Sequence, residues 1–256
     1  MSASAPVVFV SHGAPTLALD ASAGGDFVRL GTALPRPAAI LVLSAHWLDS
    51  PATIGTVTTR PLYYDFSGFP DELYSVHYEA PPAASLADEL HRRLPDLARD
   101  DRRPWDHGVW VPLLHMFPRA DVPLLELSLP YRQTPRDWYD LGSRLAFLRD
   151  QNVLLLASGG AVHNLRQLDW NHGPTPPTWA TEFESWLRQT LLAADHDALL
   201  DYRNRAPALR QAHPTEDHLA PLLVALGATA ARPTAPTFPI EGWEYGSLSR
   251  LAIRWS

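Results

Sequence analysis

The chain of 256 residues contains no cysteine. Disulfide bonds, thiolate metal sites, iron–sulfur clusters and cysteine nucleophiles are therefore excluded together. No apolar run approaches the roughly 20 residues that a transmembrane helix needs. The amino-terminal segment Met1–Pro6 has neither a basic nor an apolar stretch, so we expect no signal peptide. These absences predict a cytoplasmic protein that has no membrane partner.

Positive charge is also scarce. The formal net charge is -7, and the arginine pairs Arg92-Arg93 and Arg102-Arg103 are short and flanked by acids. A negative chain without a basic stripe is a poor nucleic-acid binder, so we expect no nucleic-acid partner. The sequence has no glycine-rich dinucleotide or phosphate-binding motif and no Gly-x-Ser-x-Gly nucleophile turn.

What the sequence does contain is an alternation of apolar runs and helical patterns. Continuous apolar runs are typical of buried strands covered on both faces. Strands are predicted at Val7–Val10, Ile40–Leu43, Val122–Leu127 and Val153–Ala157, and helices at Ala23–Leu34, Ala84–Leu94, Pro135–Arg149 and Trp179–Leu192. This order indicates an α/β fold. We predict a single domain over residues 1–256, with a central, mostly parallel or mixed β-sheet flanked by helices.

The carboxyl-terminal part predicts one more helix and one more strand. Thr215 is a suitable N-cap, and the acids that follow it suit the positive end of a helix. Leucines recur at one-face helical spacing over Leu219–Leu226. We expect Gly227 to end this helix as a left-handed cap, and Ser247–Trp255 to form the last strand.

The positions of the histidines point to a site. His12, His46 and His163 each follow a predicted buried strand by a few residues. In open α/β sheets, ligands bind outside the carboxyl ends of the strands. His218 would lie at the third position of the last predicted helix, where the positive helix end keeps an imidazole neutral.

Four such histidines suit a catalytic metal. Neutral imidazole is the commonest metal ligand, and a catalytic metal keeps three protein ligands and leaves positions open. His12, His46, His163 and His218 therefore divide into three ligands and one acid/base. Each alone could be an ordinary loop or core residue, but the repeated placement at strand ends favours the site. A serine hydrolase using Ser158 and His163 would leave the other three histidines unexplained.

Six short motifs occur in order and at characteristic spacing. They are Ser11–Pro15 (SHGAP), Ser44–Trp47 (SAHW), Asp65–Pro70 (DFSGFP), Asp106–Gly108 (DHG), Ser158–Leu165 (SGGAVHNL) and His213–His218 (HPTEDH). Over the range from His12 to Ser249, the sequence resembles the class III extradiol ring-cleavage dioxygenases of the DOPA-dioxygenase-type branch. Each motif is weak alone, and the set of six in order is specific.

The resemblance implies a single α/β domain and a role for each site residue. The metal ligands would be His12, His46 and His218. His163 would be the catalytic acid/base, and His107 would stand beside the ligands or face the substrate.

The resemblance also implies the reaction. An oxidoreductase of this kind uses O2 to open the ring of a catechol-type substrate beside its two hydroxyls. One non-haem Fe(II) or Zn(II) per chain would be the cofactor, and the catechol and O2 the partners. We expect His77 and Asp65 to bind the substrate, and assembly into a homo-oligomer is left open.

One departure from the better-studied protocatechuate-cleaving relatives concerns the third ligand. Those enzymes place a glutamate where this chain has His218, and three neutral ligands leave the charge of the metal uncompensated. His213 or Glu216 could instead complete the set. Three histidines also resemble a hydrolytic zinc site. The alternative functions are therefore a zinc-dependent hydrolase and a non-enzymatic binding member of the fold.

Overall fold

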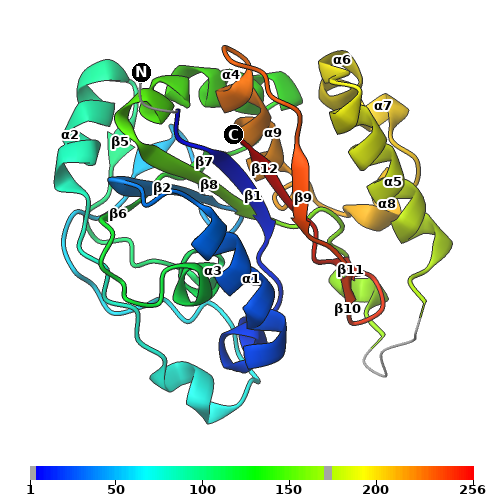
Figure 1. The fold of residues 1–256 in the computed structure, drawn as a ribbon, viewed down its shortest axis with the longest axis horizontal. Coiled ribbons are helices and arrows are strands. Elements are labelled where there is room, and N and C mark those ends of the chain that lie inside the picture. Colours follow the sequence, from blue (N-terminus) through cyan, green and yellow to red (C-terminus); the bar gives the residue numbers. More distant parts are fainter. Residues whose placement is uncertain (1–3, 170–174) are drawn as a thin grey trace.

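A computed structural model describes residues 4–169 and 175–256, and a sheet of six strands forms its centre (Figure 1). The strands are β1 (Val7–Ser11), β2 (Ala39–Ser44), β6 (Leu124–Glu126), β8 (Val153–Gly159), β9 (Thr237–Ile240) and β12 (Ala252–Trp255). Their order across the sheet is β6-β2-β8-β1-β12-β9. The pairs from β6 to β1 are parallel, while β12 runs antiparallel to both of its neighbours. The predicted α/β fold with a mainly parallel sheet is confirmed.

Helices cover both faces of this sheet. They are α1 (Ala21–Ala33), α2 (Ala84–Arg93), α3 (His107–Met116), α4 (Pro135–Leu145), α5 (Thr178–Leu192), α6 (His196–Leu200), α7 (Tyr202–Arg205), α8 (Leu209–Ala212) and α9 (Ala220–Thr229). Figure 1 shows α1 and α3 on one face and α4 and α9 on the other, with α5 to α8 beyond β9.

Alternation along the strands creates two hydrophobic cores. Val8 and Val10 of β1 pack into the core that contains residues of α1 and α3. Val7 and Phe9, on the opposite face, pack into the core that contains residues of α2, α4, α5 and α9. Because successive side chains of a strand point to opposite faces, a fully apolar strand needs cover on both sides. This burial holds the strand ends, and the loops that follow them, in fixed positions.

Shorter elements complete the described chain. Three strand pairs lie outside the central sheet: β3 (Leu48–Asp49) with β7 (Leu129–Pro130), β4 (Thr53–Ile54) with β5 (Ala98–Arg99), and β10 (Trp243–Glu244) with β11 (Leu248–Ser249). The 3-10 helices are η1 (Pro15–Leu19), η2 (Asp71–Ser75), η3 (Ala146–Gln151) and η4 (Leu165–Gln167).

The last helix differs from the prediction at both ends. It begins at Ala220 rather than just after Thr215, so His218 lies in the preceding turn. Pro221 falls in its first turn, where proline costs no hydrogen bond. Gly227 does not end the helix, which continues to Thr229. A Cβ at Gly227 would overlap the carbonyl oxygen of Tyr139 in α4, so this glycine serves close helix packing.

The predicted final strand is interrupted. Ser247–Trp255 forms two strands, β11 and β12, which pair in different sheets. Between them, the backbone N–H of Arg250 donates to the carbonyl of Gly242, which turns the chain away from one continuous ladder. The predicted helix over Pro135–Arg149 likewise divides into α4 and η3.

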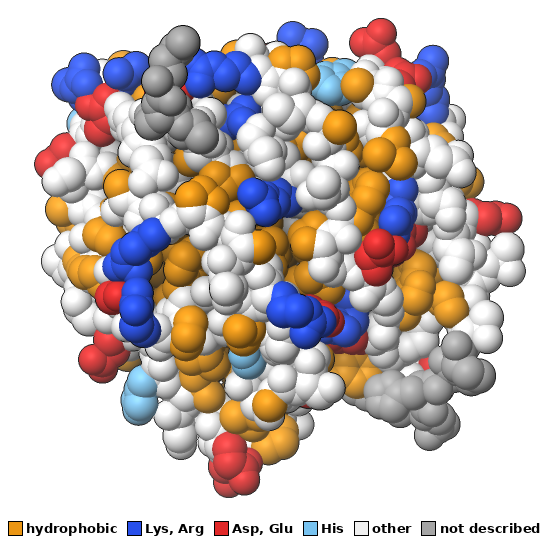
Figure 2. Space-filling view, viewed as in Figure 1, with side chains coloured by type: hydrophobic (Ala, Val, Ile, Leu, Met, Phe, Trp, Pro, Cys, Tyr) orange, Lys and Arg blue, Asp and Glu red, His pale blue; other side chains and the backbone are white. Residues whose placement is uncertain are grey.

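The surface mixes side chains of every kind. On the face drawn in Figure 2, basic and acidic side chains are interspersed among hydrophobic and uncharged ones. Within the described ranges, none of the helices combines the length and the hydropathy that crossing a lipid bilayer requires.

Candidate active site

The carboxyl ends of three strands bring three histidines to one edge of the sheet. His12 directly follows β1, His46 comes two residues after β2, and His163 comes four residues after β8. Because β2, β8 and β1 are parallel neighbours, their carboxyl ends lie side by side. The backbone N–H of His12 also donates to the carbonyl of Gly159 at 3.0 Å, which ties the end of β1 to the end of β8. This is the edge at which α/β proteins bind ligands.

His218 reaches the same edge from the turn before α9. Its carbonyl oxygen accepts a hydrogen bond from the backbone N–H of Gly160 at 2.9 Å. A Cβ at Gly159 would overlap that same oxygen, so the approach requires a residue without a side chain. Gly159, which ends β8, and Gly160, which follows it, therefore determine where His218 lies.

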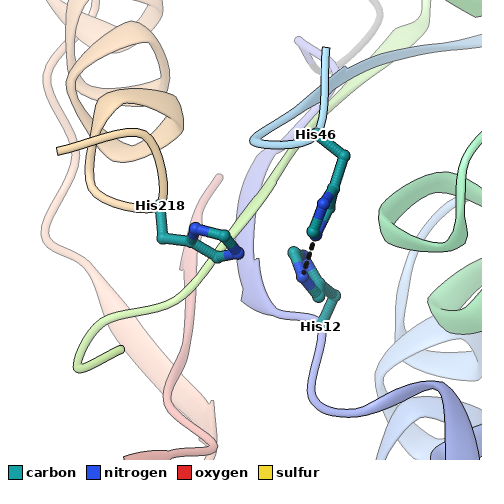
Figure 3. A group of neighbouring side chains, drawn as sticks. All are labelled: His12, His46 and His218. Carbon is teal, nitrogen blue, oxygen red and sulfur yellow. Dashed lines mark hydrogen bonds between the residues drawn. The ribbon is translucent and has the colours of Figure 1, made fainter. Parts of the chain in front are cut away.

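Ring nitrogens of His12, His46 and His218 converge on a common point (Figure 3). One nitrogen of each ring lies within 4.8 Å of the others, and Nε2 of His12 is 3.0 Å from Nε2 of His46. The centroid of the His218 ring lies 5.3 Å from that of His12 and 5.0 Å from that of His46. The structure thus brings together the three residues that the resemblance names as metal ligands.

Hydrogen bonds behind the rings fix two of the tautomers. The hydroxyl of Ser158 donates to the carbonyl of Gly108 at 2.5 Å, so its oxygen accepts from Nδ1–H of His12 at 3.0 Å. Nδ1–H of His218 donates to the carboxylate of Asp217 at 2.6 Å, and this bond lowers the pKa of Asp217 although burial acts to raise it. Both rings therefore carry their proton on Nδ1 and present the lone pair of Nε2 to the site.

Asp65 plays the same part for His46. Its carboxylate lies 3.4 Å from Nδ1 of His46, and it accepts from Nδ1–H of His107 at 2.8 Å and from the backbone N–H of His107 at 3.1 Å. Burial alone would raise the pKa of Asp65, but the hydrogen bond from His107 and the nearby His46 bring it below its usual value. An ionised Asp65 thus orients both imidazoles.

Two observations indicate that His12, His46 and His218 suit a metal ion. Burial, followed by repulsion from the neighbouring imidazoles, lowers the pKa of His12 and of His46 well below its usual value, so both rings are neutral. Nε2 of His12 is an acceptor and lies 3.0 Å from Nε2 of His46, a separation at which two imidazole nitrogens can share either a proton or a metal ion. Nε2 of His218 is buried and has no hydrogen-bond partner among the described residues. Such nitrogens suit zinc, iron or copper.

His163 lies next to this group but outside it. Its ring stacks on that of His218 with centroids 3.5 Å apart and planes inclined by 5°. Burial, followed by repulsion from His218, lowers the pKa of His163 to about 2, so the ring is neutral at physiological pH. A neutral imidazole beside a metal ligand can accept a proton from a bound molecule.

The two alternative third ligands have other partners. His213 is buried, and its Nε2–H donates to the carbonyl of Ala161 at 2.9 Å. Glu216 is held by two hydrogen bonds from Arg203, each of 2.7 Å. Neither residue belongs to the groups of potential metal ligands found in the described chain.

A cavity of 410 Å³ opens over the histidines. His12, His46, His107, His163, His218 and Asp65 all line it, together with a mostly apolar wall. His77 does not line it: this residue follows η2 and is exposed to solvent. The expectation that Asp65 contacts substrate has the cavity geometry behind it, whereas for His77 no contact with the cavity supports the same expectation.

Sequence reasoning missed the hydrogen-bond partners of the ligands. It treated Ser158 only as a rival nucleophile and Asp217 only as a favourable charge near a helix start. Two signals could have identified them: Ser158 is the residue of β8 beside the carboxyl end of β1, and Asp217 is adjacent to His218 in the chain. Carboxylates and hydroxyls commonly orient metal-binding histidines in this way.

Comparison with known proteins identifies the fold and its chemistry. The family described as the catalytic LigB subunit of aromatic ring-opening dioxygenase matches residues 27–251. The chain belongs to this LigB family. The family assignment agrees with the resemblance carried by the six motifs, and the matched range includes His46, His163 and His218.

LigB-family relatives match nearly the whole chain. A protein of Escherichia coli (strain K12) named 4,5-DOPA dioxygenase extradiol is 37% identical, covering 97% of this chain and 94% of its own. The protein of the same name from Beta vulgaris is 35% identical, covering 94% and 92%. The crystal structure of an uncharacterized protein from Escherichia coli K12 superposes with a TM-score of 0.82 at 33% identity, over 98% of this chain and 100% of the other.

These findings establish the class of reaction. As a LigB enzyme with relatives named extradiol dioxygenases, the protein is a metal-dependent dioxygenase that uses O2 to open the ring of a catechol-type substrate. The two alternatives, a zinc-dependent hydrolase and a non-enzymatic binding member, are not favoured by any of these relatives.

Proposed function

We propose that His12, His46 and His218 bind one non-haem Fe(II) per chain and that a catechol binds above them in the cavity. The observation that carries this proposal is the arrangement of the three rings. Nδ1 of each ring faces an oxygen, of Ser158, Asp65 or Asp217, and the three rings turn their other nitrogens towards one point. Nε2 of His218 is buried and has no hydrogen-bond partner among the described residues, which supports a metal ion at that point.

Iron is favoured over zinc by the reaction. Zn(II) has no redox chemistry, whereas opening an aromatic ring with O2 requires electrons to pass from the ring to oxygen. Fe(II), when bound, would provide that path and would hold the catechol in place. Three neutral ligands leave its charge uncompensated, which favours a catechol bound as an anion.

His163 is proposed as the acid/base. Stacking on His218 holds its ring beside a ligand of the metal and within the cavity. Its ring is neutral, so a nitrogen is available to accept a proton from a catechol hydroxyl whose acidity a bound metal would raise, and to return one to the product. The wall of the cavity around it is largely apolar, so it offers few other groups that could take up this proton.

His107 and Asp65 are proposed to position the substrate. Asp65 fixes the proton of His107 on Nδ1, which leaves Nε2 as an acceptor for a hydroxyl of the catechol. The His107 and His46 ring centroids are only 4.1 Å apart, so a group bound by His107 lies close to the metal ligands. Asp65 contributes by orienting the rings of His46 and His107.

Metal loading and mutagenesis test this proposal. Metal-free protein is loaded with Fe(II) under nitrogen, given a panel of catechols and then exposed to air. We expect one iron per chain, and a yellow ring-opened semialdehyde with iron but not with zinc. His12→Ala, His46→Ala and His218→Ala should each lose the metal, measured by mass spectrometry of the elements.

The matched control is His91→Ala, which removes an exposed histidine of α2. It should retain the metal. Stoichiometric iron in His12→Ala would refute the assignment. If His213→Ala released the metal and His218→Ala did not, these two residues would have to exchange roles.

A further inference from the structure

The cavity wall differs sharply from its floor. The histidines and Asp65 form a polar floor, and the residues around it are mostly apolar. The largest apolar side chains of the wall are Phe66, Phe69, Val162, Leu165, Leu168 and Leu248. A catechol whose two hydroxyls face the floor would therefore direct its ring substituent towards apolar surface.

No cationic side chain lines this cavity within the described residues. The chain contains no lysine, and residues 170–174 contain no arginine. Arg166 follows Leu165 but is exposed and does not line the cavity. Arg250 lines a neighbouring hollow, where it pairs with Asp26 at 2.8 Å and with Glu244 at 3.3 Å. The cavity thus offers no arginine to an anion.

Two serine hydroxyls of the wall are also committed as donors. Ser11 donates to the carbonyl of Leu251 at 2.9 Å, and Ser249 donates to the carboxylate of Glu184 at 2.5 Å. The hydroxyl of Tyr245 shares a hydrogen bond of 3.1 Å with that of Thr16, in which either group can be the donor. Apart from the imidazoles, the charged side chain that faces the cavity is the carboxylate of Asp65, which repels an anion.

A carboxylate on the substrate would therefore lie against apolar surface and near Asp65, with no arginine or lysine among the described lining residues to pair with it. Moving an ionised group out of water is costly unless it is paired and hydrogen-bonded. An uncharged substituent of the same size meets no such cost and gains from contact with the apolar wall. The difference appears directly in the relative binding of two substrates that differ only in charge.

We propose that this site takes catechols whose ring substituent is uncharged and discriminates against catechols that carry a carboxylate on that substituent. The inference rests on the proposed function, because it assumes that the catechol hydroxyls face the histidines.

The test compares dihydrocaffeate with its primary amide, a pair of nearly equal size that differ in charge, and adds propylcatechol as an apolar reference. Binding is measured by calorimetric titration of the Fe(II)-loaded protein under nitrogen, and turnover is measured separately in air. We expect Kd to be lower and kcat/KM higher for the amide by about tenfold or more, the effect of roughly 1.4 kcal/mol. Equal Kd and equal kcat/KM for the acid and the amide would overturn the proposal.

Leu165→Arg supplies the missing cation at the exposed rim of the cavity, and Leu165→Gln is its uncharged control. The ratio of kcat/KM for the acid to kcat/KM for the amide should rise about tenfold in Leu165→Arg and stay at the parent value in Leu165→Gln. A ratio that does not change in Leu165→Arg would show that the missing cation is not the cause. If no catechol is cleaved, the proposed function fails, and the Kd ratio still decides this inference.

Discussion

The imidazole of His163 stacks face to face on that of His218, with ring centroids 3.5 Å apart. His218 belongs to the group whose nitrogens converge, whereas His163 does not. The stack therefore separates two roles that residue type alone cannot distinguish. We propose that His218 holds the metal and that His163 exchanges protons with the molecule bound there.

Replacement of His163 should separate chemistry from binding. His163→Ala is expected to retain its metal and to bind catechol, because the three converging rings remain. Turnover should fall by about 10²–10⁴-fold, the usual cost of losing general acid–base help. Metal content and kcat measured in the same preparation check this. Loss of the metal together with activity would mean that His163 is a ligand, and full activity would remove it from the site.

Replacement of Ser158 should weaken metal binding without removing a ligand. Ser158→Ala leaves Nδ1–H of His12 without its acceptor and frees the ring to change tautomer or orientation. Loss of such a partner typically costs about 10–100-fold in metal affinity. Competition with a chelator measures the affinity, and Ser143→Ala, an exposed serine of α4, is the control. An unchanged affinity would show that Ser158 does not orient His12.

Glu126 should make the protein less stable as the pH rises. This residue ends β6 and is fully buried, and burial, followed by the nearby Asp106, raises the pKa of its carboxyl well above 4.5. The folded state therefore keeps a proton that the unfolded state loses above about pH 4.5, so stability falls as pH rises through this range. Glu126→Gln lacks this titration.

Urea unfolding of the metal-free protein at several pH values tests the effect. The stability of Glu126→Gln relative to the parent should increase from about pH 5 to pH 8. Glu79→Gln, at an exposed position, controls for the loss of one carboxyl. A difference that is independent of pH would mean that Glu126 is ionised in the folded protein.

Two glycines should be intolerant of any side chain. A Cβ at Gly142 of α4 would overlap the carbonyl oxygen of Val224, and one at Gly227 of α9 would overlap that of Tyr139. Gly142→Ala and Gly227→Ala should each lower the free energy of unfolding by about 1–3 kcal/mol or more, because the helices must separate.

The matched change is Gly25→Ala in α1, where the added Cβ would meet only the side chain of Arg29 at 3.7 Å. Here alanine should raise the free energy of unfolding by about 0.5–1 kcal/mol, since it lowers the entropy of the unfolded chain. Chemical denaturation of the three variants compares the effects. Equal stability of Gly227→Ala and the parent would contradict the close approach of α4 and α9.

The sequence alone predicted the sheet and three of the histidines at its edge. Apolar runs placed β1, β2 and β8, and parallel order was implied by the helices between them. Because parallel strands end at one edge, His12, His46 and His163 could converge there, and the adjacency of β2, β8 and β1 in the structure brings them together. This part of the site follows from local patterns that any reader of the sequence can apply.

The place of His218 was decided by tertiary packing. The helical pattern extended too far towards the amino terminus and included His218, whereas in the structure α9 begins later and the residue lies in a turn. Its position depends on a backbone approach to Gly159 and Gly160, more than 50 residues earlier in the chain. No local periodicity in the sequence indicates such a contact. Only the order of the six motifs had suggested that His218 joins the other histidines.

Tautomer and charge were likewise decided by the fold. The sequence determines which atoms are available: imidazoles, serine, acids, no thiol and no lysine. The tertiary structure determines which of them meet, since Ser158, Asp65 and Asp217 each face Nδ1 of one converging histidine, while no arginine among the described residues lines the cavity. Hydrogen bonds and ion pairs act over a few ångströms, so their partners are fixed by three-dimensional packing and not by spacing along the chain.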